Sequence, residues 1–231
     1  MQLMKKHVII VAGGTGKRMR SEKPKQFMLL NHLPVLMHTL NAFYAFDESI
    51  EIVVVLPRMH LQEWKMLCKK FNYNISHQVV EGGPTRFHSV KNGLDKIPDT
   101  DGYVAVHDGV RPFIDEDTIA RCYRDAAIHG SAIPVIPPND SLRIIEVDSS
   151  KIIDRNRVRI IQTPQVFNLN ILRLAYKQSF NESFTDDASV VEAAGYKIFL
   201  TEGHRGNIKI THPEDWIFAS AWLKKDDTSA N

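Results

Sequence analysis

The 231-residue chain is long for one compact domain and short for two. Its hydrophobic share of 43% and charged share of 24% lie near globular averages, which excludes collagen-like, intrinsically disordered and disulfide-scaffold proteins. The 29 basic and 27 acidic residues give a net charge of +2, so we expect neither nucleic acid nor a membrane as a partner. We expect a single domain over residues 1–231.

Strand-like and helix-like segments alternate along the chain. The apolar runs are His7–Ala12, Glu51–Leu56, Tyr103–His107, Ser131–Ile136 and Lys197–Thr201. The amphipathic stretches are Val35–Phe46, Met59–Phe71, Ser89–Lys96, Asp115–His129 and Asp186–Ala194. This alternation predicts an α/β, Rossmann-like fold, with a mostly parallel open sheet and helices on both faces.

Residues 136–157 interrupt the alternation. Pro137 and Pro138 precede two short β-like pieces, Leu142–Glu146 and Ile152–Ile153, which Asp148-Ser149-Ser150 separates. Prolines and a polar turn favour a hairpin over a crossover helix, so we expect a protruding β-hairpin arm. An isolated hairpin is marginally stable in water, which makes a second subunit the natural partner for the arm. A surface excursion on a monomer is the alternative.

The expected location is the cytoplasm. Cys68 and Cys122 have neither metal-site spacing nor the density of a secreted disulfide framework. The apolar run Val8–Val11 passes quickly into glycines and is too short for a signal peptide. No stretch approaches the roughly 20 apolar residues of a membrane span.

A glycine-rich segment follows the first predicted strand: Ala12-Gly13-Gly14-Thr15-Gly16-Lys17-Arg18-Met19. Its backbone N–H groups could wrap a polyphosphate. A dinucleotide fingerprint would need a third glycine where Met19 stands, and a P-loop would need glycine at Val11 and Ser or Thr at Arg18. A different phosphate-binding loop remains, with a solvated basic turn as the alternative.

Cations follow this loop closely. A triphosphate that loses pyrophosphate needs positive charge on its α-phosphate and on the leaving group. Arg18 and Lys25 suit that task. Further along, Asp108 lies just past a predicted strand end, where open α/β sheets bind ligands, and a carboxylate beside a triphosphate usually holds Mg²⁺ or another divalent cation.

The loop and the following Lys-Pro-Lys-Gln-Phe block resemble the signature of the sugar-phosphate cytidylyltransferases. Within that group the chain is similar to the 2-C-methyl-D-erythritol 4-phosphate cytidylyltransferase family. The resemblance extends over further blocks. These are Glu81–Val90, Val106–Phe113, Asp154–Asn156 with Gln162–Phe167, and Thr185–Ser189 with Gly203–Thr211.

The resemblance implies a set of site residues. It places CTP on the glycine-rich loop and assigns cytosine and ribose recognition to Gly83 and Ser89, with Arg86 in support. It places Asp108 near the metal and the acceptor, with Arg111 supporting the loop. It also implies that Arg155 reaches into the partner subunit's site to bind the acceptor phosphate, together with Lys209 and a hydroxyl contact from Thr185. Thr185 is also a plausible helix cap, and Lys209 is expected in a short, otherwise buried strand with an anionic partner.

The implied reaction transfers CMP from CTP to methylerythritol 4-phosphate, in isoprenoid precursor synthesis, by a homodimer. Ribitol 5-phosphate is a second candidate acceptor, because Gly13 and Gly109-Val110 depart from the methylerythritol pattern toward that sister group. Two further hypotheses stay open, a non-catalytic nucleotide-binding dimer and an enzyme that uses UTP or GTP.

Overall fold

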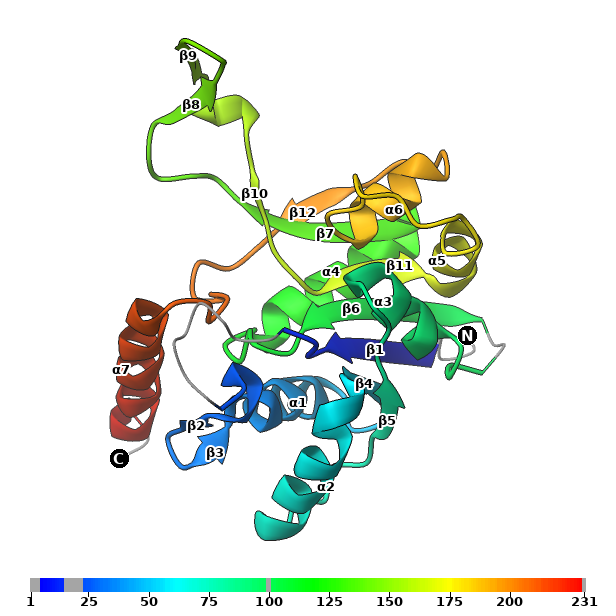
Figure 1. Ribbon diagram of the computed structural model, residues 1–231, viewed down its shortest axis with the longest axis vertical. Helices are drawn as coiled ribbons and strands as arrows, with labels where there is room; N and C mark the ends of the chain where they lie inside the picture. The colour runs from blue at the N-terminus through cyan, green and yellow to red at the C-terminus, as the bar shows by residue number, and fades with distance from the viewer. Residues whose placement is uncertain (1–4, 15–22, 99–100, 230–231) are drawn as a thin grey trace.

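The computed structural model describes residues 5–14, 23–98 and 101–229. Its central sheet has the strand order β10-β7-β11-β6-β1-β4-β5, and β12 also pairs with β7 (Figure 1). These strands are β1 Lys5–Val11, β4 Glu51–Leu56, β5 Gln78–Glu81, β6 Gly102–Asp108, β7 Ser131–Ile136, β10 Ile160–Ile161, β11 Gln165–Asn168 and β12 Leu200–Glu202. The pairs β6–β1, β1–β4, β4–β5 and β7–β12 are parallel, whereas β11 runs antiparallel to β6 and β7, and β10 antiparallel to β7.

Helices cover both faces of this sheet. They are α1 Val35–Phe46, α2 Leu61–Lys70, α3 Arg86–Leu94, α4 Glu116–His129, α5 Leu169–Ala175 and α6 Asp187–Ala193. Helix α7, Pro213–Ser229, lies apart from the sheet and packs through Ala219 in a separate cluster with Leu30, Val110 and Ile210 (Figure 1). Short 3-10 turns are η2 Lys25–Phe27, η3 Arg58–His60 and η4 Arg155–Arg157, and β2 Leu29–Leu30 pairs with β3 Leu33–Pro34. The α/β prediction with helices on both faces is therefore confirmed.

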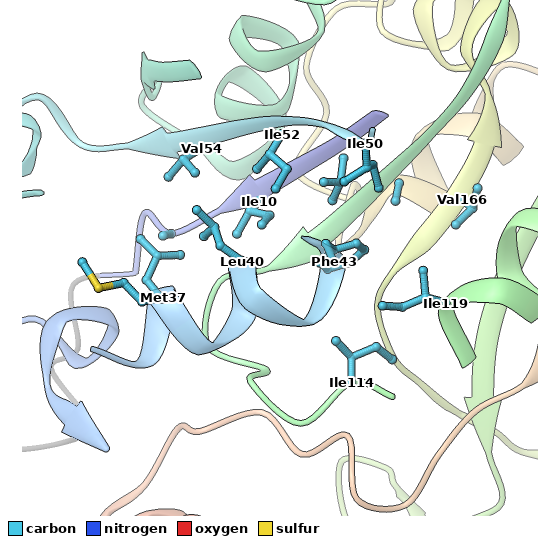
Figure 2. Close-up of a cluster of buried hydrophobic side chains, with 14 of the residues drawn as sticks. Ile10, Met37, Leu40, Phe43, Ile50, Ile52, Val54, Ile114, Ile119 and Val166 are labelled. Carbon is cyan, nitrogen blue, oxygen red and sulfur yellow. The ribbon is translucent and has the colours of Figure 1, made fainter. Parts of the chain in front are cut away.

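The central strands are mostly apolar because both faces of the sheet are buried. In β1, Val8 and Ile10 pack with α1, α2 and α4, while Ile9 packs with α3, α5 and α6. Figure 2 shows the first of these clusters, with Leu40 and Phe43 of α1 directed toward the strands. Alternate side chains of one strand thus serve two separate cores.

Several elements were not predicted from the sequence, among them strands β5 and β11 and helix α5. The edge strand β5 buries only Val80 of its four residues, so it has no apolar run. Strand β11 follows Pro164 directly, and its helix α5 is short. By contrast, Glu51–Leu56, Ser131–Ile136 and Val35–Phe46 have the predicted bounds.

The predicted arm is a β-hairpin that projects from the body (Figure 1). Strand β8, Leu142–Ile145, pairs antiparallel with β9, Ser150–Ile153, in a two-stranded sheet of their own. Much of its apolar surface is uncovered, since Ile145 is 79% and Val147 99% exposed. None of the helices in the described ranges is long and apolar enough to cross a membrane.

Candidate active site

A cavity of about 330 Å³ opens at the carboxyl ends of the parallel strands. Val11 ends β1, Leu56 ends β4 and Asp108 ends β6, and all three line the cavity. This edge is where open α/β sheets bind ligands. Nine residues predicted for the site line it: Ala12, Gly13, Gly14, Lys25, Gly83, Arg86, Ser89, Asp108 and Lys209. Thr15, Gly16 and Arg18 lie outside the described residues.

Lys25 is fixed beside the glycine loop. It begins the turn η2 after Pro24, and only 7% of it is exposed. Its Nζ donates to the carbonyl of Ile210 at 3.0 Å, and Gln26 donates its side-chain amide to the carbonyl of Ala12 at 3.0 Å. Both contacts hold the basic turn against the strand end, so the ammonium group is already oriented at the cavity wall.

Gly83 and Ser89 form a compact loop before α3. The backbone N–H of Gly83 donates to Ser89 Oγ at 3.1 Å, and this hydroxyl donates to the carbonyl of Thr85 at 2.9 Å. A Cβ on Gly83 would collide with the side chain of His88, so glycine is required there. The loop can therefore bring its backbone close to a flat group in the cavity.

Asp108 lies at the centre of a cluster of cations. Its Oδ2 accepts from Lys209 Nζ at 3.0 Å and from Arg111 Nε at 3.1 Å. Burial alone would raise the pKa of Asp108, but Lys209, Arg86 and Arg111 outweigh it and hold the pKa well below the usual range. The carboxylate is therefore ionised at any working pH. Arg111 also donates to the carbonyl of Asn207 at 2.8 Å, which confirms its predicted supporting role.

A second cavity of about 270 Å³ adjoins the first. Arg86, Asp108 and Lys209 line both cavities, and Thr185 lines the second. Two ligands bound in the two cavities would therefore both lie next to Arg86, Lys209 and Asp108. That arrangement suits the transfer of an anionic group from one ligand to the other.

The structure corrects two expectations about these residues. The segment around Lys209 belongs to no strand, and the Lys209 side chain is 43% exposed. Its expected anionic partner is present as Asp108. Thr185 does not cap α6. Asp186 does, because its carboxylate accepts from the N–H of Ser189 and the Ser189 hydroxyl side chain closes the capping box.

Arg155 lies apart from both cavities of its own chain. It begins η4 at the base of the arm, is exposed, and donates to the carbonyl of Asn139 at 3.0 Å. The other predicted residues within the described ranges come together without a second chain.

Sequence reasoning missed several polar residues of the second cavity. Gln162, Thr163 and Gln165 line it, although the sequence marked them only as part of a block that resembles the family. Thr163 Oγ1 accepts from the N–H of Asp108 at 3.1 Å and contacts His107 Nδ1 at 3.1 Å. The signal available in the sequence was their position, directly after the segment that leads from the arm back to the sheet.

No group of three or more His, Cys, Asp or Glu side chains that could hold a metal occurs in the described ranges. Asp108 is the carboxylate that lines both cavities, so it would be the ligand of a divalent cation at their junction. One carboxylate completed by phosphate oxygens and water is a usual environment for Mg²⁺. The residues present fit a metal that arrives with a polyphosphate.

Comparison with known proteins gives a consistent result. The family model for 2-C-methyl-D-erythritol 4-phosphate cytidylyltransferase matches residues 6–225. Proteins of that name from Bacteroides fragilis and Bacteroides thetaiotaomicron are 49% and 50% identical, over 93% and 95% of this chain and 98% and 100% of theirs. The crystal structure of the Thermus thermophilus protein of that name, 32% identical, aligns with a TM-score of 0.78 over 96% of this chain and 100% of that one. This chain therefore belongs to the 2-C-methyl-D-erythritol 4-phosphate cytidylyltransferase family.

Proposed function

We propose that this chain transfers CMP from CTP to 2-C-methyl-D-erythritol 4-phosphate in the cytoplasm, releasing pyrophosphate. The observation that carries the proposal is the pair of adjoining cavities that share Arg86, Asp108 and Lys209. The first cavity, bordered by the glycine loop and Gly83, takes the nucleotide. The second, with Thr185, takes the acceptor.

The reaction is a direct in-line displacement. A phosphate monoester is already mostly a dianion near neutral pH, since its second pKa is about 6, so its oxygen needs no general base. It attacks the α-phosphorus of CTP, forming the new P–O bond as the bond to pyrophosphate breaks. Lys209 orients the acceptor phosphate, while Lys25 and Arg18 offset the charge that builds on the α-phosphate and the leaving group.

A divalent cation completes the proposed site, with Asp108 as its protein ligand. Bound there, Mg²⁺ would neutralise phosphate charge and polarise the phosphoryl group. Asp108 suits this role because its neighbours keep it ionised. Chelating divalent ions with EDTA should abolish turnover, and added Mg²⁺ should restore it.

The arm supports a homodimer. Ile144, Ile145, Val147 and Ile152 on or beside the hairpin are each more than half exposed, an apolar surface that a second subunit would cover. In a dimer built this way, Arg155 would enter the partner subunit's acceptor cavity. An arginine fork fits a phosphate monoester well.

The acceptor is tested by pyrophosphate release with CTP, Mg²⁺ and either methylerythritol 4-phosphate or ribitol 5-phosphate at equal concentration. We expect clear preference for the first. Preference for ribitol 5-phosphate would replace the proposed acceptor, and silence with both would favour a non-catalytic nucleotide-binding dimer. Substituting UTP or GTP for CTP in the same assay tests the nucleotide.

The ribitol hypothesis gains nothing from Gly109. A Cβ there would lie 2.9 Å from the Ala12 Cβ and 3.0 Å from Leu36 Cδ1, so local packing accounts for the glycine. Gly13 has open space around its missing Cβ, and nothing in its packing explains it.

A mixing experiment tests the shared site. Arg155→Ala and Lys209→Ala chains are first assayed alone at an acceptor concentration far below the wild-type KM, where each should have at most about a tenth of wild-type activity. They are then unfolded together and refolded. If Arg155 acts across subunits, each mixed dimer regains one intact site, so about a quarter of all sites should be active after random pairing. If Arg155 acts within its own chain, every site lacks one residue and mixing restores nothing. A monomer mass by light scattering at micromolar concentration would also contradict the dimer.

A further inference from the structure

Arg86 occupies the junction of the two cavities. It is the first residue of α3, it lines both cavities, and its side chain is 30% exposed. Its Nη2 donates to Asp187 Oδ2 at 2.6 Å, a charge-assisted contact that links residues 101 positions apart. The guanidinium thus has one edge tied into the protein, while the side chain borders the space where the two ligands meet.

Asp187 is buried completely, yet both of its oxygens are used. Oδ2 receives Arg86, and Oδ1 accepts from the hydroxyl of Tyr176 at 2.7 Å. A buried carboxylate is costly unless it is paired and hydrogen-bonded, so this geometry is held tightly. Tyr176 is only 2% exposed. The three side chains form a line from the core to the cavity junction.

Neighbouring elements hold Asp187, in the middle of this line, and Tyr176, at its inner end. Gln165 of β11 donates to Asp186 Oδ2 at 2.8 Å and accepts from the N–H of Ala188 at 2.9 Å, which ties the first turn of α6 to the sheet. The ring of Tyr176 stacks on Phe87 of α3, with centroids 4.8 Å apart. Asp187 therefore sits between two fixed supports rather than on a free helix end.

Proton positions along the line are also fixed. Burial, reinforced by Asp187, raises the pKa of Tyr176 well above its usual value, so its hydroxyl stays a donor. Burial alone would lower the pKa of Arg86, but the charge of Asp187 outweighs it and raises the pKa instead. The tyrosine donates, the carboxylate accepts and the guanidinium donates across the working pH range.

We propose that Asp187 and Tyr176 are positioning residues that aim the Arg86 guanidinium at the phosphate groups meeting between the two cavities. Arg86 then acts on the transferred phosphoryl group and the acceptor phosphate rather than on the base and ribose. The inference rests on the proposed function, because it concerns the geometry of that transfer. A preorganised cation at the reacting phosphate lowers the barrier without reorganisation during the reaction.

The test compares Tyr176→Phe, Asp187→Asn and the double variant with the wild type in steady-state assays that vary CTP and acceptor separately. Asp187→Asn should lower kcat/KM for the acceptor on the order of 100-fold, since a misplaced catalytic cation costs about that much. Tyr176→Phe removes one hydrogen bond and should cost about three- to tenfold. The KM for CTP should change less than about threefold in both, because nucleotide binding rests on the glycine loop.

The double variant should be no slower than Asp187→Asn alone, since the tyrosine acts only through the carboxylate. Tyr123→Phe is the matched control. It removes another buried tyrosine hydroxyl, one that donates to the carbonyl of His7 away from both cavities. Its melting temperature should fall as much as that of Tyr176→Phe, with kcat and both KM values unchanged.

Wild-type kcat and acceptor KM in folded Asp187→Asn and Tyr176→Phe would overturn the inference and leave Arg86–Asp187 a structural ion pair. Equal increases in the KM for CTP and for the acceptor would also overturn it. If Asp187→Asn fails to fold, comparing the kcat and acceptor KM of Tyr176→Phe with those of Tyr123→Phe decides the question. Absence of turnover in the wild type itself would instead remove the proposed function.

Discussion

The body of the sheet and the arm use the same apolar residue types in opposite ways. Ile9 and Ile10 of β1 are fully buried, whereas Ile145 and Val147 of the arm are 79% and 99% exposed. The central strands of the body have helices on both of their faces, while β8 and β9 have only each other. The body thus buries its apolar side chains within one chain, whereas the arm leaves its own exposed.

Charged groups follow the same division. In the body, Asp108 and Asp187 are buried, and each is paired with cations that border the cavities. On the arm, the Lys151–Glu146 pair is solvated, with side chains 73% and 39% exposed. Exposed pairs of this kind contribute little to stability. The buried ion pairs that border the cavities therefore belong to the body, whereas this pair on the arm is solvated.

The largest contrast should appear in folding stability. Leu40 is fully buried in α1, so Leu40→Ala should lower the free energy of unfolding by about 3 kcal/mol. Ile145→Ala, the same kind of truncation on the arm, should change it by less than about 0.5 kcal/mol. Urea denaturation at low protein concentration measures both. Equal losses would mean that the arm is part of the folding core.

The next effect concerns Lys25. Lys25→Ala should lower kcat on the order of 100-fold, because this cation acts on charge that develops during transfer. The dissociation constant for CTP should change much less. Lys65→Ala on α2, an exposed lysine that lines neither cavity, is the control for loss of one positive charge. Near-normal turnover in Lys25→Ala would remove it from the catalytic residues.

The pH dependence of stability should also come from the body. Burial lowers the pKa of His107 to about 4, below the value of about 6.5 for an unfolded chain. Between these values the unfolded state binds the proton and the folded state does not, so stability falls as pH falls. Between pH 7 and pH 5 the free energy of unfolding should therefore fall by about 2 kcal/mol. Urea unfolding of His107→Gln should not show this decrease. The same dependence of unfolding free energy on pH in the wild type and in His107→Gln would contradict this assignment.

The smallest effect should be that of the arm's arginine. Arg155→Ala should raise the acceptor KM about tenfold and leave the KM for CTP unchanged, since Arg155 is expected to hold only the acceptor phosphate. Arg157→Ala, an exposed arginine of the same turn, is the matched control and should behave as the wild type. A change confined to CTP binding would show that the arm serves the nucleotide instead.

Much of the fold was predictable because strands that are buried on both faces have continuous apolar runs, and the helices that cover them have periodic apolar residues. The runs that became β4 and β7 and the helix α1 are continuous or periodic enough to identify from their own residues. Strand β5 could not be identified in this way, because it is an edge strand with one buried side chain. Nothing local indicated that β11 would insert antiparallel between β6 and β7.

For the candidate site, the sequence predicted which residues come together better than it predicted the local structure around them. Isoleucines on both sides of Lys209 suggested a buried strand, but Ile210 makes a single backbone contact with Val110 and no ladder forms. The pattern around Asp187 indicated only a helix start, because its partner Arg86 lies on another element. Contacts between residues far apart in the sequence leave no pattern in the residues around them. Such contacts determine the geometry of the site.

The hydrogen bond from Lys25 to Ile210 also bears on how the protein is made. It joins residues 185 positions apart, so the nucleotide loop leaves the ribosome long before the segment that orients its lysine. Contacts of such long range form late in folding. The nascent chain can therefore assemble most of its sheet while the transfer site stays incomplete. The site is completed only when residues 207–211 pack against Lys25 and Val110.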